Sequence, residues 1–144
     1  MNQTNQHPRS VIRNAIIDQL KNKTDAGSNI YGNRAKPLFD QFLPAILVYA
    51  QQENILEDQY DHDGHALLKR ELEIAIEAVI LGEDDLDQRL DNICVQIESA
   101  LHGFEIENKK STIIKLKSTQ IESSDEGSKV YGAARLIYLA IYHA

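Results

Sequence analysis

The final stretch of the sequence, KVYGAARLIYLAIYHA over residues 129–144, limits the possible folds more than any other segment. Its two sets of alternating positions are both apolar or aromatic, with Ala134, Leu136, Tyr138 and Tyr142 in one and Ala133, Ile137, Leu139 and Ile141 in the other. A strand that is apolar on both faces is covered on both faces. We therefore expect this strand inside a sheet, with helices over one face and another subunit against the second.

Period-two alternation is clearest over residues 68–80. Apolar side chains occupy the even positions Leu68, Leu72, Ile74, Ile76, Ala78 and Ile80, and charged ones the odd positions Lys69, Glu71, Glu73 and Glu77. This pattern predicts a long strand with one solvated face. Shorter apolar runs predict strands at 29–35, at 42–52 with Pro44 marking the start, at 111–122 and at 130–142.

Helical periodicity appears twice. Residues 8–23 place Val11, Ile12, Ala15, Ile16 and Leu20 on one side of a helix that begins at Pro8. Residues 82–103 carry a stripe of Leu86, Leu90, Ile93, Ile97 and Leu101, with Asp84, Asp85 and Asp87 at the start and Gly103 as a cap at the end. The element order is therefore α-β-β-β-α-β-β.

These elements predict an α+β (mixed α/β) fold in one domain covering residues 1–144, with residues 1–7 flexible. Its sheet is mixed but mostly antiparallel, has about five strands and is packed by two helices. At 144 residues, a single core is expected.

Composition excludes several classes of function. A formal net charge of -7 repels nucleic acid, so a protein that reads DNA sequence is disfavoured. No signal peptide and no apolar run approaching the roughly 20 residues of a membrane span is visible, which predicts a cytoplasmic protein. Cys94 is the single cysteine and lies within the second helical pattern, where a small buried hydrophobic side chain is expected.

A possible metal site lies in DQYDHDGH, which contains Asp58, Asp61, His62, Asp63 and His65. An EF-hand loop with Gly64 at its sixth position would place Arg70 at the twelfth, where glutamate is required. Asp-Gly between two strands instead favours a hairpin turn. The segment is therefore interpreted as a hairpin tip without a metal.

No catalytic motif emerges from the remaining polar residues. Glu71, Glu73 and Glu77 share one strand face and are best interpreted as a solvated face opposite Lys115 and Lys117 of a neighbouring strand. The sequence contains no glycine-rich phosphate loop, nucleophile elbow or cysteine–histidine cluster, so it predicts neither an enzyme nor a cofactor. The tyrosines of the last strand favour a subunit interface over base stacking, because Arg135 is their one close cation.

Taken together, these segments resemble the phage tail terminator proteins, also called minor tail protein U. The likeness spans nearly the whole chain, through VIRNAIIDQL at 11–20, NIYGNRAKPLFDQFLPAILVYAQQEN at 29–54, LLKRELEIAIEAVILGEDDLDQRLDNI at 67–93 and SDEGSKVYGAARLIYLAIYHA at 124–144. Its most specific parts are LPAILVY, the alternating strand that runs into an acidic helix start, and DEG before the tyrosine-bearing last strand.

The resemblance implies a ring, with six subunits as the expected number, that caps the finished tail tube, stops its growth and offers a surface for head joining. Its implied partners are further copies of itself, the major tail tube protein and a head-completion or neck protein. DNA passes through the ring without sequence-specific binding, and no membrane is involved. The protein would be assembled in the bacterial host cytoplasm and reside in the virion tail.

Residues predicted at a subunit or tube interface are Glu71, Glu73, Glu77, Lys115, Lys117, Arg135, Tyr138 and Tyr142. The alternatives are a neck or head-completion adaptor, or a small cytoplasmic immunity or regulatory protein with a similar mixed sheet.

Overall fold

A computed structural model describes residues 6–32, 40–60, 63–82, 84–106, 113–127 and 129–144. Within these residues, two helices and a five-stranded sheet form an α+β fold, as the sequence predicts. Its elements are the helices α1 (Pro8–Leu20) and α2 (Leu86–Leu101), the 3-10 turn η1 (Asp40–Phe42), and the strands β1 (Ile30–Tyr31), β2 (Ala45–Tyr60), β3 (Ala66–Gly82), β4 (Ile113–Glu126) and β5 (Lys129–His143).

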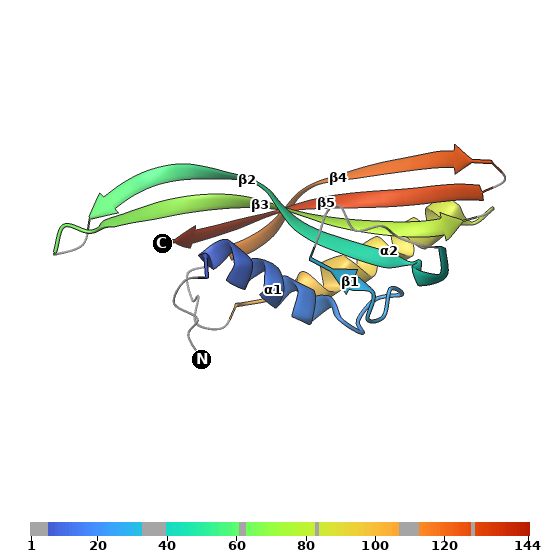
Figure 1. Cartoon of the computed structure of the whole chain (residues 1–144), viewed down its shortest axis with the longest axis horizontal. Helices are drawn as coiled ribbons and strands as arrows, with labels where there is room; N and C mark the ends of the chain where they lie inside the picture. The colour runs from blue at the N-terminus through green and yellow to red at the C-terminus, as the bar shows by residue number, and fades with distance from the viewer. Residues whose placement is uncertain (1–5, 33–39, 61–62, 83, 107–112, 128) are drawn as a thin grey trace.

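The strand order across the sheet is β1-β2-β3-β5-β4. Antiparallel ladders join β2 to β3, β3 to β5 and β5 to β4, and the short β1 runs parallel to β2. The last strand of the chain thus lies between two long strands, which confirms its predicted place inside the sheet. Both helices lie on the same side of the sheet (Figure 1).

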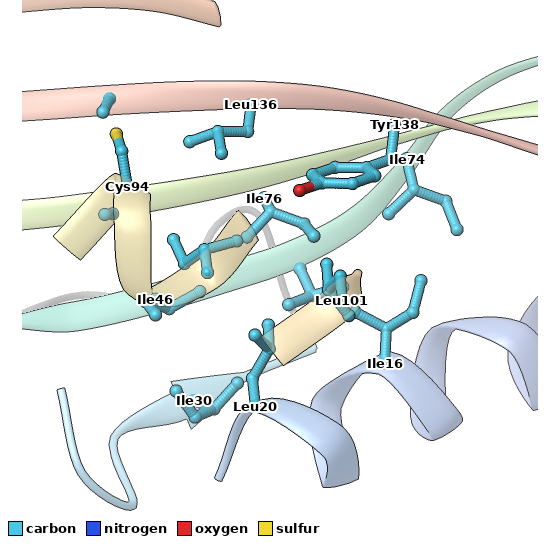
Figure 2. Packing of buried hydrophobic residues seen from close by; sticks show 14 of the residues in the cluster. Ile16, Leu20, Ile30, Ile46, Ile74, Ile76, Cys94, Leu101, Leu136 and Tyr138 are labelled. Atoms are coloured by element: carbon cyan, nitrogen blue, oxygen red, sulfur yellow. The ribbon is translucent and has the colours of Figure 1, made fainter. Parts of the chain in front are cut away.

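The hydrophobic core lies between the helices and this side of the sheet. Even-numbered side chains of β3 and β5, among them Ile74, Ile76, Leu136 and Tyr138, meet the apolar stripes of both helices (Figure 2). Cys94 of α2 is part of this core, as predicted. The alternation of period two in the strands and 3.6 in the helices therefore directs each set of apolar side chains to one shared layer.

Helix α2 packs closely on two glycines of the sheet. A Cβ atom at Gly82 would lie 2.1 Å from Leu86 Cδ1, and one at Gly132 would lie 2.8 Å from the same atom. Because both strands lack a side chain there, the first turn of α2 can approach β3 and β5 directly. This contact fixes the start of α2 against the end of β3 and the beginning of β5.

The helix ends follow the sequence signals in part. Helix α1 begins at Pro8 with the His7 ring accepting a hydrogen bond from the Arg9 backbone N–H. It ends at Leu20, three residues earlier than predicted, and Asn22 adopts a left-handed φ of 60°. Helix α2 is followed by Gly103 at φ 65°, the conformation of the predicted cap. Among the described residues, no helix has the length and apolarity needed to span a membrane.

The sequence interpretation was wrong about the polar segment after residue 52. Strand β2 starts directly after Pro44 as predicted but continues to Tyr60, because the ladder to β3 persists through two register shifts, at 50/52 and 55/57. Strand β4 likewise extends to Glu126, four residues beyond its predicted end at 122, and Gly127 then takes a left-handed φ of 66°. The expected strand 29–35 is reduced to β1, and its residues 33–35 lie outside the described part.

Candidate assembly surface

The face of the sheet turned away from both helices is called the open face here. It carries alternate residues of the four long strands, including Leu47, Tyr49, Glu71, Glu73, Glu77, Lys115, Lys117, Arg135, Ile137 and Leu139. No helix covers this face among the described residues, and yet Ile137 and Leu139 are only 6% and 8% exposed. The chain itself therefore covers these two side chains, and the expectation that another subunit lies against this face of the last strand stays a prediction.

An ion pair explains how Leu139 is covered. Leu139 of β5 lies between Glu73 of β3 and Lys115 of β4 in the ladder. Lys117 Nζ lies 2.7 Å from Glu73 Oε1, so the two side chains meet across the central strand. Hydrogen bonding to Glu73 and its charge raise the pKa of Lys117. The aliphatic stems of such charged residues cover apolar surface while their charged ends remain at its boundary.

A second charged group lies further along the open face. Glu77 Oε1 accepts hydrogen bonds from Arg135 Nε at 3.0 Å and from the Tyr49 hydroxyl at 3.1 Å. The three residues come from β3, β5 and β2, so the group ties three strands together. The hydrogen bond with Glu77 raises the pKa of Arg135 further, which keeps this guanidinium charged at every pH at which the protein folds.

The open face is hollowed near the β4–β5 turn. Asp40 of η1 reaches over the sheet, pairs with Lys129 and accepts a 2.9 Å hydrogen bond from the Tyr131 hydroxyl. Beside it lies a hollow of about 360 Å³, lined by Asp40, Leu43, Glu77, Val79, Glu122, Ser123, Ser124, Tyr131, Gly132 and Ala133. Three carboxylates border this hollow. Asp40 and Glu77 each have a cation within contact distance, so the hollow combines acidic groups with their own counter-charges.

The predicted interface residues divide into two groups. Six of them, Glu71, Glu73, Glu77, Lys115, Lys117 and Arg135, lie on the open face, and four of these form the two ion pairs described above. Tyr138 and Tyr142 lie instead on the helix side and are 4% and 1% exposed. Burial, with the nearby Glu98 and Cys94, raises the pKa of Tyr138 to about 12. The assignment of these eight residues to a subunit or tube interface remains a prediction.

Sequence reasoning missed a cluster that holds the end of the chain. Glu53 of β2 accepts hydrogen bonds from Arg9 at 2.8 Å, from Arg70 at 3.0 Å and from the Tyr142 hydroxyl. Arg70 Nε also donates to the backbone carbonyl of Ala144 at 3.1 Å. Ala144 in turn exchanges two backbone hydrogen bonds with Leu68. The cluster could not be seen because Glu53 lies in a polar stretch without periodicity.

Glu53 predicts how stability depends on pH. Burial raises the pKa of this carboxyl, but hydrogen bonds from Tyr142, Arg70 and Arg9 outweigh it and leave the pKa lowered. A carboxylate with a lowered folded-state pKa contributes stability above its unfolded pKa, and this stability is lost as pH falls through the folded-state pKa.

We expect the free energy of unfolding to decrease below about pH 5. Urea titrations at several pH values measure this, and Glu53→Gln should flatten the acidic limb; equal slopes in both proteins would contradict it.

The described residues offer no site for a resident metal ion. No group of three or more His, Cys, Asp or Glu side chains among them could hold a metal. Asp58, Asp63 and His65 lie around the β2–β3 turn, whereas Asp61 and His62 of the predicted hairpin tip lie outside the described residues. The open face combines apolar side chains with ion pairs, and the described part of the chain leaves strand edges unpaired; these features are typical of structural proteins that assemble with other chains.

Comparisons with known proteins identify the family. The sequence model described as phage minor tail protein U matches residues 7–142. The chain therefore belongs to the phage minor tail protein U family, as its sequence suggests. A comparison with curated proteins gave no match.

A solved structure supports the fold. A chain in a structure titled "Virion of native gene transfer agent (GTA) particle" superposes with a TM-score of 0.60 at 11% sequence identity, covering 92% of this chain and 95% of that chain. At this identity the likeness concerns the fold alone. Membership of this family gives the protein a structural role in the phage tail, and therefore in the virion.

Proposed function

We propose that this protein is a tail terminator, which forms a ring on the finished tail tube, stops further tube subunits from adding and presents a surface for head joining. The observation that carries the proposal is the family match over nearly the whole chain, residues 7–142. The mosaic of apolar side chains and ion pairs on the open face supports it, because such surfaces suit contacts between protein subunits. Its role is binding rather than turnover of a substrate.

The charge of the chain suits a ring through which DNA passes. The net charge is -7, and the exposed side of α2 carries Asp87, Asp91 and Glu98. Acidic groups on the inner wall of the ring would repel the duplex and let it pass without binding, whereas a basic wall would retain it. The proposed partners are further copies of this chain, the major tail tube protein and a head-completion or neck protein, and assembly takes place in the host cytoplasm.

The test is electron microscopy of particles made without this gene. Without a terminator, tube subunits should continue to add, so tails longer than normal and not joined to heads are expected. Supplying the gene in trans should restore normal length, which controls for effects on neighbouring genes. Tails of normal length attached to filled heads would show that this chain is not the terminator.

A further inference from the structure

The hairpin of β2 and β3 extends past the rest of the sheet. Strand β5 pairs with β3 only as far as Lys69, and the chain end reaches Leu68. Residues 55–60 of β2 and 66–70 of β3, called the arm here, form the end of this hairpin, which continues beyond Asp58 and Leu68 as two strands (Figure 1). The arm exposes three large apolar side chains of β2: Ile55 is 48% exposed, Leu56 45% and Tyr60 71%. Exposed apolar surface of this extent along an outer strand is typical of a contact with another protein chain.

A second exposed apolar group lies along β4, at the opposite edge of the sheet. Leu116 is 37% exposed and Ile121 54%, both on the helix side, and Val95 on the neighbouring α2 is 62% exposed. Between the C-terminal half of α2 and the start of β4 lies a hollow of about 270 Å³, lined by Glu98, Leu101, His102, Gly103, Ile114, Lys115, Leu116 and Tyr138. Leu116, Ile121 and Val95 together form this second exposed apolar group.

The arm and strand β4 also present free strand edges. Strand β4 is the last of the sheet order, and among the described residues no strand pairs with its outer edge. Strand β2 pairs with β1 only at Ile46 and Leu47, so its outer edge from Ile55 to Tyr60 also lacks a strand partner within the described part of the chain. Unpaired backbone N–H and C=O groups along a strand are a template for another strand.

We propose that the arm of one copy pairs with β4 of the next copy, with residues 55–60 lying antiparallel to residues 116–121, so that the sheet continues from subunit to subunit. The inference rests on the ring of the proposed function and assigns its interface. In this pairing Ile55 meets Ile121, and Tyr60 meets Leu116. Each segment contains one register shift, between Ile55 and Glu57 in β2 and between Leu116 and Ser118 in β4. Because each strand carries one extra residue, the two segments have the same paired length and both ends can be aligned.

Strand direction and side-chain face agree with this pairing. Three antiparallel steps separate β2 from β4, so the two strands run in opposite directions within one chain. Copies repeated side by side in the same orientation therefore place β4 antiparallel to the next β2. Ile55 lies on the same side as Glu53 and Arg70, and Ile121 is paired with the core residue Ala134. Both apolar side chains thus project from the helix side and would cover each other.

Charge also favours a second copy as the occupant. The arm carries the exposed carboxylates Glu57 and Asp58, and the beginning of β4 carries Lys115 and Lys117. The pairing brings these opposite charges near each other, which favours the contact and its register. Both halves of the contact occur on this one chain, at opposite edges of its sheet. A contact between two different surfaces repeats head to tail and closes into a ring when the rotation permits.

Cross-linking between two single-cysteine variants tests the contact. In a Cys94→Ala background, Ile55→Cys and Ile121→Cys proteins are mixed at high concentration and treated with a short bis-maleimide. A cross-linked dimer is expected from the mixture and not from either variant alone, because the surfaces are different. A single chain carrying both cysteines should give a ladder of larger products. Asn14→Cys, on an exposed position of α1, mixed with Ile121→Cys is the matched control and should give no dimer.

A charge on the edge provides a second measurement. Ile121→Lys places a cation on the free edge of β4 and should shift the protein to monomers in sedimentation, with an unchanged melting temperature. Asn14→Lys adds the same charge on α1 and should leave assembly as it is. Absence of the cross-linked dimer, or an Ile121→Lys protein that assembles like its parent, would overturn the arm–β4 contact.

The outcomes separate this contact from the proposed function. Rings seen by electron microscopy that give no 55–121 cross-link would overturn the contact and leave the terminator role standing. Tails of normal length without the gene would overturn the terminator role, whereas the cross-link would then still report pairing between copies.

Discussion

Removing residues 137–144 is expected to unfold the protein. The truncation takes away the half of β5 that pairs with both β3 and β4 over residues 69–75 and 113–118. It also deletes Tyr138, Ala140 and Tyr142 from the core and separates β3 from β4. The stabilising free energy from burying those side chains and from pairing β5 with both neighbours exceeds the net 5–15 kcal/mol by which a typical domain is stable. The measurement is the circular dichroism spectrum and melting curve of the truncated chain.

A shorter truncation serves as the control. Ending the chain after Tyr142 removes the two Leu68–Ala144 backbone hydrogen bonds and the Arg70–Ala144 contact but leaves the core side chains. We expect this protein to fold with a melting temperature lower by several degrees, since each lost hydrogen bond contributes about 1 kcal/mol. A soluble 1–136 protein with an unchanged melting curve would show that the last strand is not required for folding.

The elements of this fold could be predicted from the sequence wherever apolar side chains repeat. The alternation over residues 68–80 marked β3, and the stripe from Leu86 to Leu101 marked α2, whose ends match it residue for residue. The doubly apolar last strand indicated a position inside the sheet. In each case one face of the element is buried, so the spacing of the apolar side chains identifies both the type of element and its buried face.

The arm could not be predicted from such a pattern. Residues 53–60 are mostly polar, and their strand conformation comes from backbone pairing with β3, which local side-chain pattern does not encode. A register shift between Ile55 and Glu57 also interrupts the alternation there, and another lies just before the segment, between Ala50 and Gln52. The predicted strand therefore ended at residue 52, eight residues before β2 does, because the backbone ladder, rather than burial, holds this segment extended.

The open face could be predicted in its residue types but not in its contacts. Glu73 and Lys117 were expected to face each other on neighbouring strands, whereas β5 lies between their strands and their side chains meet across it. Asp40 and Tyr131 were not anticipated at all, because they are 91 residues apart and meet only through the placement of η1 over the sheet. Strand order decides both contacts, and the sequence of elements does not determine strand order.

Replacing Glu53 by alanine is expected to lower stability by about 2 kcal/mol or more, the second large effect in this chain. The Glu53 side chain is 11% exposed, and its carboxylate joins α1, β2, β3 and the end of β5 through Arg9, Arg70 and Tyr142. Without it, the Tyr142 hydroxyl and Nη1 of Arg70, whose side chain is 19% exposed, lose their acceptor, whereas Arg70 Nε keeps the Ala144 carbonyl. A buried polar group left without a partner loses its hydration without compensation.

The matched control is Glu57→Ala, which removes the same side chain four residues along β2 from an exposed position. It should change the free energy of unfolding by no more than about 0.5 kcal/mol. The double variant of Glu53→Ala with Tyr142→Phe then distinguishes the cluster from a simple loss of volume. Because Tyr142 has no carboxylate to donate to once Glu53 is gone, removing its hydroxyl should cost less in that background than in the parent. Equal effects of Tyr142→Phe in both backgrounds, measured by urea titration near pH 7, would show that Glu53 and Tyr142 contribute independently and that the cluster does not hold the chain end as one unit.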